Sequence, residues 1–570
     1  MNTTTKKIAA LLALIMLLTF CVMLVSCGNG STENNDTNNT DQSLPASEGL
    51  AYEVNDDGTC TITGIGTCKD TEIVIPQMIE GHRVSAVAEG AFKNAVVDYA
   101  PYAGGEGAEP EQNEEQSPLE KIVKVKFPNL AIDIGDEAFY GCGSLAEIDT
   151  PNITSLIGKD AFKETAYYNN EENWENGALY LEEYLVAVKE NISGTFTVKD
   201  GIKNIADRAF YGRTRLEYVI IPESVISIGR EAFSGCTALK EVNIPGFAYI
   251  YESAFEGCTA LKKAHVGIDK EPTKAPQFES DASISIGQIN GGASGGNGNI
   301  IYGTNIAGGN FGNVFSGGSF ATIYYEGVIN PNGTISLVHN ATVLRSGVFK
   351  NCTALEKITF GKSVTLIGNA AFCGCTALKE IEIPENVTEI TGGDTFYGCS
   401  SLEKVNLGEN ITEIGLAEFQ GCTSLKNIVI PDSVKKIGQD AFRGCTSLEY
   451  VALGSGLERI EMYAFAECKS LKELIFPDSL KYVGERAIFG CSSIEKIVIN
   501  VGIEEFGDCA LNECAYYEYK GTLAQWNAVE KDDKGWMVGI PLENGMIGYF
   551  RNSYTLVCTD GTIKDGKIEG

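Results

Sequence analysis

A short phrase returns along this chain at a fixed spacing, and that periodicity limits the fold more than any other feature. In its fullest form the phrase carries Phe442, Cys445 and Leu448, and its phenylalanine recurs at 396, 419, 442 and 465, 23 residues apart each time. Further copies surround Phe92, Phe139, Phe162, Phe210, Phe233, Phe255, Phe349 and Phe372, and the position decays to Ile488 and Leu511. A period in the twenties with leucine-type positions predicts stacked single-turn units. The chain has 570 residues, too many for one compact core but natural for a repeat array.

Each unit contains two short extended segments and a bend. In one unit Ile381 and Ile383 alternate with polar residues, which is typical of a half-buried strand. Pro384 ends that strand because proline cannot donate to a ladder. A second short segment, 387–390, leads into the phenylalanine bend. We therefore predict a β-rich solenoid with parallel strands, irregular insertions and little helix.

The phrase that runs from Ile430 through Phe442 to Cys445 resembles the BspA-type leucine-rich repeats of bacterial surface proteins. Residues 58–87 resemble the first repeat of that family, and residues 519–562 resemble its terminal cap. The resemblance covers about 50–265 and 335–565. It implies a solenoid that serves attachment, but solenoid families share a scaffold while their ligands differ.

The first residues predict export. Lys6 and Lys7 precede an apolar run, and residues 24–27, ending in Cys27, resemble the lipobox in which cysteine becomes the lipidated first residue of the mature chain. An ordinary signal peptide or a retained transmembrane anchor are the alternatives. Residues 28–48 are polar and predict a disordered tether, which spans roughly 25 Å as a flexible coil.

The solenoid is expected in two parts, 49–267 and 335–515, followed by a C-terminal cap at 516–570. The first part carries an acidic insertion at 94–118 and a second insertion at 167–190, where a hairpin is predicted to turn at Glu182 and Glu183. Between the parts lies a glycine-rich insertion, 268–334. It lacks the helix and lysine that a phosphate loop needs, so a protrusion that varies binding is the better interpretation.

Most of the 18 cysteines fall at one point of successive units, which predicts a column of small buried thiols. The C-terminal members of this column are Cys352, Cys375, Cys399, Cys422, Cys445, Cys468, Cys491 and Cys514. Neighbours would lie about 5 Å apart, but their parallel side chains suit a disulfide poorly, so free thiols are expected.

No residue set predicts catalysis. The three histidines lie in separate units, and Cys373 with Cys375 is not joined by a second metal-type cluster. We therefore expect no catalytic residue, no metal and no cofactor. The net charge of −32 argues against a nucleic-acid partner.

Two outward columns follow if Ile381 and Ile383 point inward. The first comprises Lys357, Glu380, Lys404, Asn427, Tyr450, Glu473 and Lys496, and its alternating charges predict pairing between units. The second comprises Thr359, Glu382, Asn406, Val429, Ala452, Ile475 and Val498, and its last four members are apolar. An exposed apolar strip marks a contact site, or else another part of the chain covers it, here the segment with Trp526 and Trp536.

These features together predict a non-catalytic cell-surface scaffold, lipid-anchored outside a bacterial membrane, that binds a protein or glycan. The candidate binding face comprises Val429, Ala452, Ile475, Val498, Tyr450, Glu382 and Asn406. An envelope-internal scaffold held close by the short tether, a structural protein without a ligand, and an enzyme with its site in 268–334 are the alternatives.

Overall fold

The computed structural model describes residues 45–93, 122–128, 132–150, 156–267, 300–303, 325–329, 335–339, 342–511, 514–531, 554–565 and 567–569. The chain divides into two compact units, Met1–Pro45 and Ala46–Gly570, and the second contains the repeats. The predicted leader, Cys27, most of the tether and the acidic insertion lie outside the described residues. Within the described residues, no helix is both long enough and apolar enough to cross a membrane.

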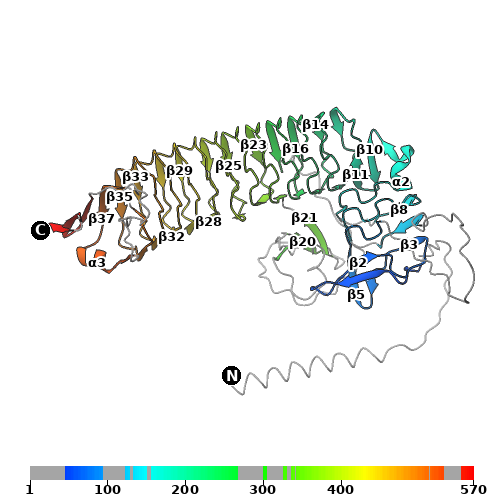
Figure 1. Ribbon diagram of the computed structural model, residues 1–570, viewed down its shortest axis with the longest axis horizontal. Helices are drawn as coiled ribbons and strands as arrows, with labels where there is room; N and C mark the ends of the chain where they lie inside the picture. Colours follow the sequence, from blue (N-terminus) through cyan, green and yellow to red (C-terminus); the bar gives the residue numbers. More distant parts are fainter. Residues whose placement is uncertain are drawn as a thin grey trace, which may run out of the picture. The chain divides into compact units, whose positions relative to one another are not determined.

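The repeats form a solenoid in which each turn contributes one strand to each of two parallel ladders (Figure 1). We call the ladder of the Pro-terminated strands ladder A. Its strands are β3 (Glu72–Val74), β6 (Lys124–Lys126), β8 (Glu147–Asp149), β12 (Gly194–Thr197), β14 (Leu216–Ile220), β16 (Glu241–Ile244), β18 (Lys263–Val266), β23 (Lys357–Phe360), β25 (Glu380–Glu382), β27 (Lys404–Asn406), β29 (Asn427–Val429), β31 (Tyr450–Ala452), β33 (Glu473–Ile475), β35 (Lys496–Ile499), β37 (Tyr516–Tyr519) and β39 (Thr555–Cys558). Two antiparallel strands, β40 (Gly561–Lys564) and β41 (Lys567–Glu569), extend its C-terminal end.

The second strand of each turn, just before the phenylalanine bend, belongs to ladder B. Its strands are β5 (His82–Val87), β7 (Asp133–Ile134), β11 (Tyr184–Val188), β13 (Asn204–Ile205), β15 (Ser227–Ile228), β17 (Tyr249–Ile250), β22 (Thr342–Leu344), β24 (Val364–Ile367), β26 (Glu389–Ile390), β28 (Glu413–Ile414), β30 (Lys436–Ile437), β32 (Arg459–Ile460), β34 (Tyr482–Val483), β36 (Glu505–Phe506) and β38 (Glu530–Lys531). The first repeat adds β1 (Ala51–Val54), β2 (Cys60–Gly64) and β4 (Met78–Ile79) beside β5. The predicted parallel solenoid with little helix is therefore confirmed.

The 167–190 insertion contains the predicted hairpin. Strands β10 (Ala178–Leu181) and β11 pair antiparallel around Glu182, and β9 (Trp174–Glu175) pairs with β10. Just before it lie α2 (Ala166–Asn169) and a 3-10 turn, η2 (Glu171–Asn173). In the C-terminal cap, α3 (Leu523–Ala528) begins with a capping box between Thr522 and Gln525.

The glycine-rich insertion interrupts the sequence without interrupting the solenoid. Strands β17 and β18 pair directly with β22 and β23 beyond it. Within and just after the insertion, the backbone forms an antiparallel sheet of β19 (Ile300–Gly303), β20 (Tyr325–Ile329) and β21 (Ile335–His339). The rest of the insertion lies outside the described residues.

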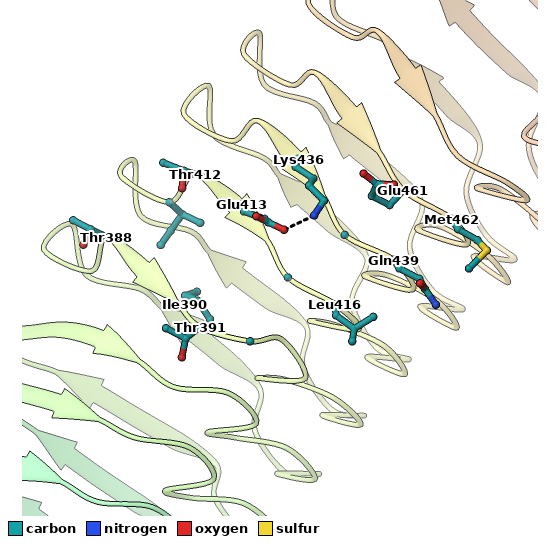
Figure 2. Close-up of a pocket in the computed structure, with 14 residues that line it drawn as sticks. Thr388, Ile390, Thr391, Thr412, Glu413, Leu416, Lys436, Gln439, Glu461 and Met462 are labelled. Atoms are coloured by element: carbon teal, nitrogen blue, oxygen red, sulfur yellow. Dashed lines mark hydrogen bonds and ion pairs between the residues drawn. The ribbon is translucent and has the colours of Figure 1, made fainter. Parts of the chain in front are cut away.

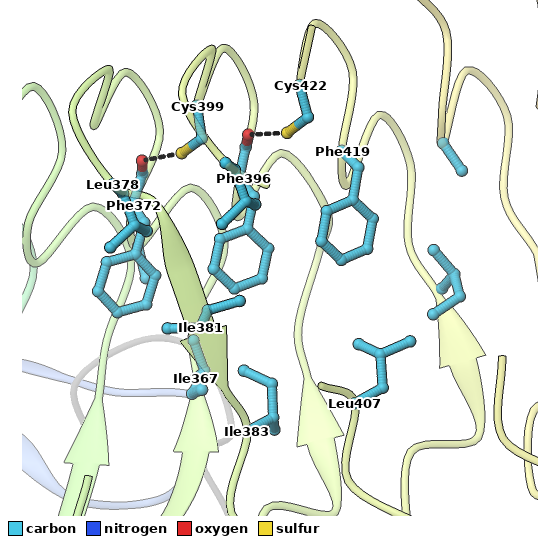
Figure 3. Close-up of a cluster of buried hydrophobic side chains, with 14 of the residues drawn as sticks. Ile367, Phe372, Leu378, Ile381, Ile383, Phe396, Cys399, Leu407, Phe419 and Cys422 are labelled. Atoms are coloured by element: carbon cyan, nitrogen blue, oxygen red, sulfur yellow. Dashed lines mark hydrogen bonds between the residues drawn. The ribbon is translucent and has the colours of Figure 1, made fainter. Parts of the chain in front are cut away.

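The phenylalanines of the bends stack along the core because each turn repeats the one before. Phe372 and Phe396 lie 5.6 Å apart between ring centroids, Phe396 and Phe419 5.2 Å, and Phe419 and Phe442 5.3 Å, with the planes within 6° of parallel (Figure 3). The stack crosses the glycine-rich insertion, since the Phe255 and Phe349 rings lie 5.4 Å apart. Full burial of each ring contributes a few kcal/mol.

The column of cysteines lies beside this stack. The Cys399 thiol donates a hydrogen bond to the Phe372 carbonyl oxygen of the preceding turn, at 3.2 Å, and the Cys422 thiol donates to the Phe396 carbonyl at 3.3 Å (Figure 3). The same bond to the preceding turn is made by Cys236, Cys258, Cys352, Cys375, Cys445, Cys468 and Cys491. Each thiol therefore adds a bond between turns at a phenylalanine carbonyl that also accepts the backbone N–H three residues further along its own turn.

Candidate binding surface

Three of the four residues that were predicted to form an apolar strip on ladder A are exposed. Val429 is 68% exposed, Ile475 is 54% exposed and Ala452 between them is also exposed. Val429 is in register with Ala452, and Tyr450 is in register with Glu473, so the three apolar side chains form one row across β29, β31 and β33. We call Val429, Ala452 and Ile475 the apolar strip.

The prediction that Val498 continues the strip is wrong, because this residue is only 5% exposed. Val498 is in register with Ile475 on one side and with Glu518 on the other. Lys496 lies 2.8 Å from the Glu518 carboxylate, and Lys520 also pairs with it. These ion pairs hold long side chains beside the valine, and they lower the pKa of Glu518 to about 2.

The strip is bordered by charged residues and one tyrosine. Tyr450 is 52% exposed in the neighbouring column, and the Lys472 ammonium lies 5.2 Å from its ring centroid. Glu382 and Asn406 are exposed at the two positions that precede the strip in its own column. In the first column Lys357 pairs with Glu380 at 3.6 Å and Glu473 with Lys496 at 3.9 Å.

The alternative that the C-terminal segment covers the strip fails for Trp526. This residue is buried in the cap, where its ring lies 5.1 Å from Tyr519 and 5.9 Å from Phe506. Trp536 lies outside the described residues. The apolar strip is therefore a solvent-facing row of three adjacent apolar residues on ladder A, where Tyr218 and Ile220 of β14 are also exposed.

The cysteines of the column are packing residues with unreactive, protonated thiols. Its members are buried as the spacing predicts, and burial raises the pKa of Cys399 and of Cys445 to about 12. A thiol that keeps its proton is a poor nucleophile and a poor metal ligand. Cys514 departs from the pattern, since its thiol donates to the Tyr516 carbonyl of its own turn.

The histidines and carboxylates form no catalytic arrangement in the described part of the chain. His82 lies 2.9 Å from the Gly58 carbonyl, and His265 lies 3.7 Å from Glu241 in another turn. Within the described residues no group of three or more His, Cys, Asp or Glu could hold a metal ion.

A hollow of about 910 Å³ lies over ladder B, and the sequence interpretation missed it (Figure 2). It is lined by Thr388, Ile390, Thr391, Gly392, Ile411, Thr412, Glu413, Gly415, Leu416, Lys436, Gly438, Gln439, Glu461 and Met462. Glu413 and Lys436 pair across it at 2.9 Å. Glu461 accepts a hydrogen bond from Arg459 at 3.0 Å.

A buried carboxyl group lies directly behind this hollow. Glu418 is 1% exposed, and the Thr395 side chain and backbone are the groups that favour its ionised form. Burial raises its pKa to about 8; the charge of Asp394 adds to the rise and Thr395 opposes it. The corresponding position before the phenylalanine is alanine in the turns of Phe372, Phe442 and Phe465. The glutamate in place of this alanine is the sequence feature that could have pointed to the site.

The repeat pattern of the BspA type leucine rich repeat region matches this chain in six copies over residues 117–195, 181–294, 330–420 and 391–518. These matches cover more than half of the chain, so it belongs to the BspA-type leucine-rich repeat proteins. None of the curated proteins matches it.

Solved structures of other leucine-rich repeat proteins are similar to this chain. A leucine-rich repeat protein from Bacteroides ovatus is 19% identical over 88% of this chain and 100% of its own, with a TM-score of 0.39. A leucine rich cell surface protein from Faecalibacterium prausnitzii is 20% identical over 87% of this chain and 100% of its own, with a TM-score of 0.28. The T. pallidum leucine rich repeat protein is 29% identical over 31% of this chain and 90% of its own, with a TM-score of 0.25.

Proposed function

We propose that this protein is a non-catalytic, cell-surface binding scaffold that holds a protein partner on ladder A through the apolar strip. The observation that carries the proposal is the row of exposed Val429, Ala452 and Ile475, which lie next to one another on three successive strands of ladder A. Exposure of a contiguous apolar row to water is unfavourable in free energy unless a partner buries the row. Tyr450 beside it supplies the amphipathic aromatic contact that interface centres favour.

The membership of a repeat family supports a scaffold, because stacked turns present a long, regular surface while buried side chains hold it rigid. We further propose that Cys27 is lipidated and anchors the chain outside a bacterial membrane. The resemblance of residues 24–27 to a lipobox supports this anchor. Replacement of Cys27 by Ala should abolish metabolic labelling with a palmitate analogue and release the chain from the membrane fraction.

The binding test compares two double variants of equal charge change. Val429→Lys with Ile475→Lys disrupts the strip, whereas Thr197→Lys with Asn243→Lys places two lysines at exposed positions of the same column, outside the candidate binding face. Pull-downs with each chain, from host extract and from cell envelope, should recover a protein with the control that the strip variant loses. Equal recovery by both variants would contradict the proposal, and a glycan array bound only by the control would reassign the ligand class.

Protease treatment of intact cells separates surface exposure from an envelope-internal location. Cleavage of the repeats on intact cells is expected if the solenoid reaches the outside. Full protection on intact cells, with cleavage after the envelope is opened, would favour the internal scaffold instead.

A further inference from the structure

The outer side of ladder B carries an apolar cluster that is buried. Tyr249, Val343 and Leu366 are in register across β17, β22 and β24. The residues that follow them belong to the core and are fully buried: Ile250, Leu344 and Ile367. Because side chains alternate across a strand, the first three side chains point away from the core. They are nevertheless only 9%, 1% and 8% exposed, and they form a cluster of their own, which we call the ladder B patch.

The same column of ladder B is charged and open to water nearer the C-terminus. Glu413, Arg459 and Glu505 also precede a core residue, and all three are exposed. The column therefore changes from charged to apolar where its side chains become buried. Such a change indicates that another part of the chain lies over β17, β22 and β24.

Neighbouring side chains account for the cover at one end of the ladder B patch. The Tyr251 ring centroid lies 4.5 Å from that of Tyr249, and the Arg345 guanidinium lies 5.8 Å from the Tyr249 ring. Leu366 lies two strands away from Tyr249, about 10 Å along the ladder. A further element is therefore needed over Val343 and Leu366.

The connection of the chain identifies that element. Strand β21 ends at His339 and β22 begins at Thr342, so only Asn340 and Ala341 join them. Three steps between Cα atoms span at most about 11 Å. The end of β21 must therefore lie beside the start of β22, where the next residue is Val343. Since β21 belongs to the antiparallel sheet of β19, β20 and β21, that sheet is held next to the patch.

A buried network of hydroxyl groups fixes the point from which the sheet extends. The Thr342 hydroxyl accepts a hydrogen bond from the Phe247 backbone N–H at 3.0 Å and lies 2.9 Å from the Ser363 hydroxyl. Ser363 in turn donates to the Gly267 carbonyl at 3.0 Å. The segment between β18 and β22 leaves after Gly267 and returns at Thr342, so both of its ends are held at one corner of the solenoid. The inner side of ladder B is filled by the core, which leaves the outer side for the sheet.

The small sheet also needs a partner. An antiparallel sheet of three short strands is stable in water only when one of its faces is buried against another element. The sequence of its two longer strands is rich in apolar residues, namely Val328, Ile329, Ile335, Leu337 and Val338. The ladder B patch and this sheet therefore have complementary needs.

We propose that the sheet of β19, β20 and β21 packs face to face on the outer side of ladder B and covers the ladder B patch. Two sheets that pack in this way lie about 10 Å apart, which the short link between β21 and β22 allows. The sheet is then attached to the solenoid and is not a free protrusion. A partner that binds it would meet it at a fixed position beside ladder B. The inference is independent of the proposed function, which concerns the apolar strip on ladder A.

Hydroxyl-radical footprinting with mass spectrometry measures the exposure of the patch in a chain without the sheet. Deletion of 269–340 removes all three strands. It leaves 22 residues between Phe255 and Phe349, the spacing that Phe233 and Phe255 already have, so the solenoid can continue across the junction.

The deletion should expose the patch. Labelling of Leu366 should rise to the level of Val429, which is 68% exposed and serves as the internal standard in both chains. Deletion of 94–118 is the matched control, because it removes a different insertion and should leave Leu366 protected.

A single substitution tests the contact in the full chain. Leu366→Glu introduces the residue that Glu413 provides in the same column, so it should release the sheet while the core side of β24 stays unchanged. Amide protons of β20 and β21 should then exchange at least about tenfold faster than in the wild type. Tyr482→Glu, in the same column of β34, changes the charge equally and should leave this exchange unchanged.

Three outcomes would overturn the inference. Leu366 that stays protected after removal of 269–340 would mean that another element covers the patch. Leu366 that becomes labelled after removal of 94–118 would assign the cover to the acidic insertion. Equal exchange of β20 and β21 in Leu366→Glu and in the wild type would show that the sheet does not rest on the patch, and this result decides even if the deleted chain does not fold.

Discussion

Replacement of Glu418 by Ala should make the protein more stable, and by an amount that depends on pH. The substitution restores the alanine that the turns of Phe372 and Phe442 carry at this position. In the unfolded chain the carboxyl ionises near its ordinary pKa of 4.5, whereas burial keeps the folded carboxyl protonated up to a pKa of about 8. Folding therefore takes up a proton between these pH values, and the wild-type chain loses stability as the pH rises through that window.

The magnitude follows from the two pKa values. One pKa unit corresponds to about 1.4 kcal/mol, so the difference between 4.5 and about 8 gives about 5 kcal/mol. Below pH 4.5 both carboxyls are protonated, and the variant should then match the wild type or fall below it, since Ala fills less of the space. Above pH 8 the advantage of the variant should reach a plateau.

Urea denaturation at a series of pH values from 4 to 9 measures the difference in unfolding free energy between Glu418→Ala and the wild type. Amide hydrogen exchange of 388–418 reports the same difference locally. Glu449→Gln is the control, because the partly exposed Glu449 pairs with Lys472 and the pKa of Glu449 is lowered, not raised. A difference between Glu418→Ala and wild type that stays flat across this range would refute the reasoning, since it would mean that the carboxyl titrates alike in the folded and unfolded chains.

Three further predictions concern the regular turns. Phe442→Ala removes a buried ring from the stack and should cost about 3–5 kcal/mol of unfolding free energy by urea denaturation, whereas Tyr397→Ala on the surface should stay within about 0.5 kcal/mol. Gly438→Ala would place a Cβ atom 2.7 Å from a backbone carbonyl of the neighbouring turn, so its melting temperature should drop, and an unchanged value would show that the turns can separate. Maleimide should label the partly exposed Cys373 in the folded chain well before buried Cys422, and mass mapping that finds the column paired in disulfides would contradict the free-thiol interpretation.

Much of the fold could be predicted because each turn repeats its neighbour. The alternation at Ile381 and Ile383 is enough to fix which side of ladder A is buried, and the spacing of the phenylalanines is enough to fix the stack. The same rule placed Val429 and Ile475 outward correctly. It failed at Val498, because alternation describes one strand, whereas burial there depends on the Glu518 ion pairs of the next turn.

The hollow could not be predicted by the same rule, although its traces are in the sequence. The spacing of 24 before Phe396 and the glutamate before Phe419 both depart from the repeat. Neither departure says whether an added residue bulges into solvent or separates two strands. Only the positions of β26 and β28 decide that question.

By itself the sequence determined the class of fold, the inward and outward faces of the strands, and the place of the buried thiols. These properties are periodic, and a periodic pattern of apolar residues has few ways to leave water. The tertiary structure alone decided that the turns on either side of the glycine-rich insertion lie next to each other, and that ladder B breaks between β26 and β28, beside Glu418. Both depend on how neighbouring backbones register against one another, and no single turn of sequence contains that information.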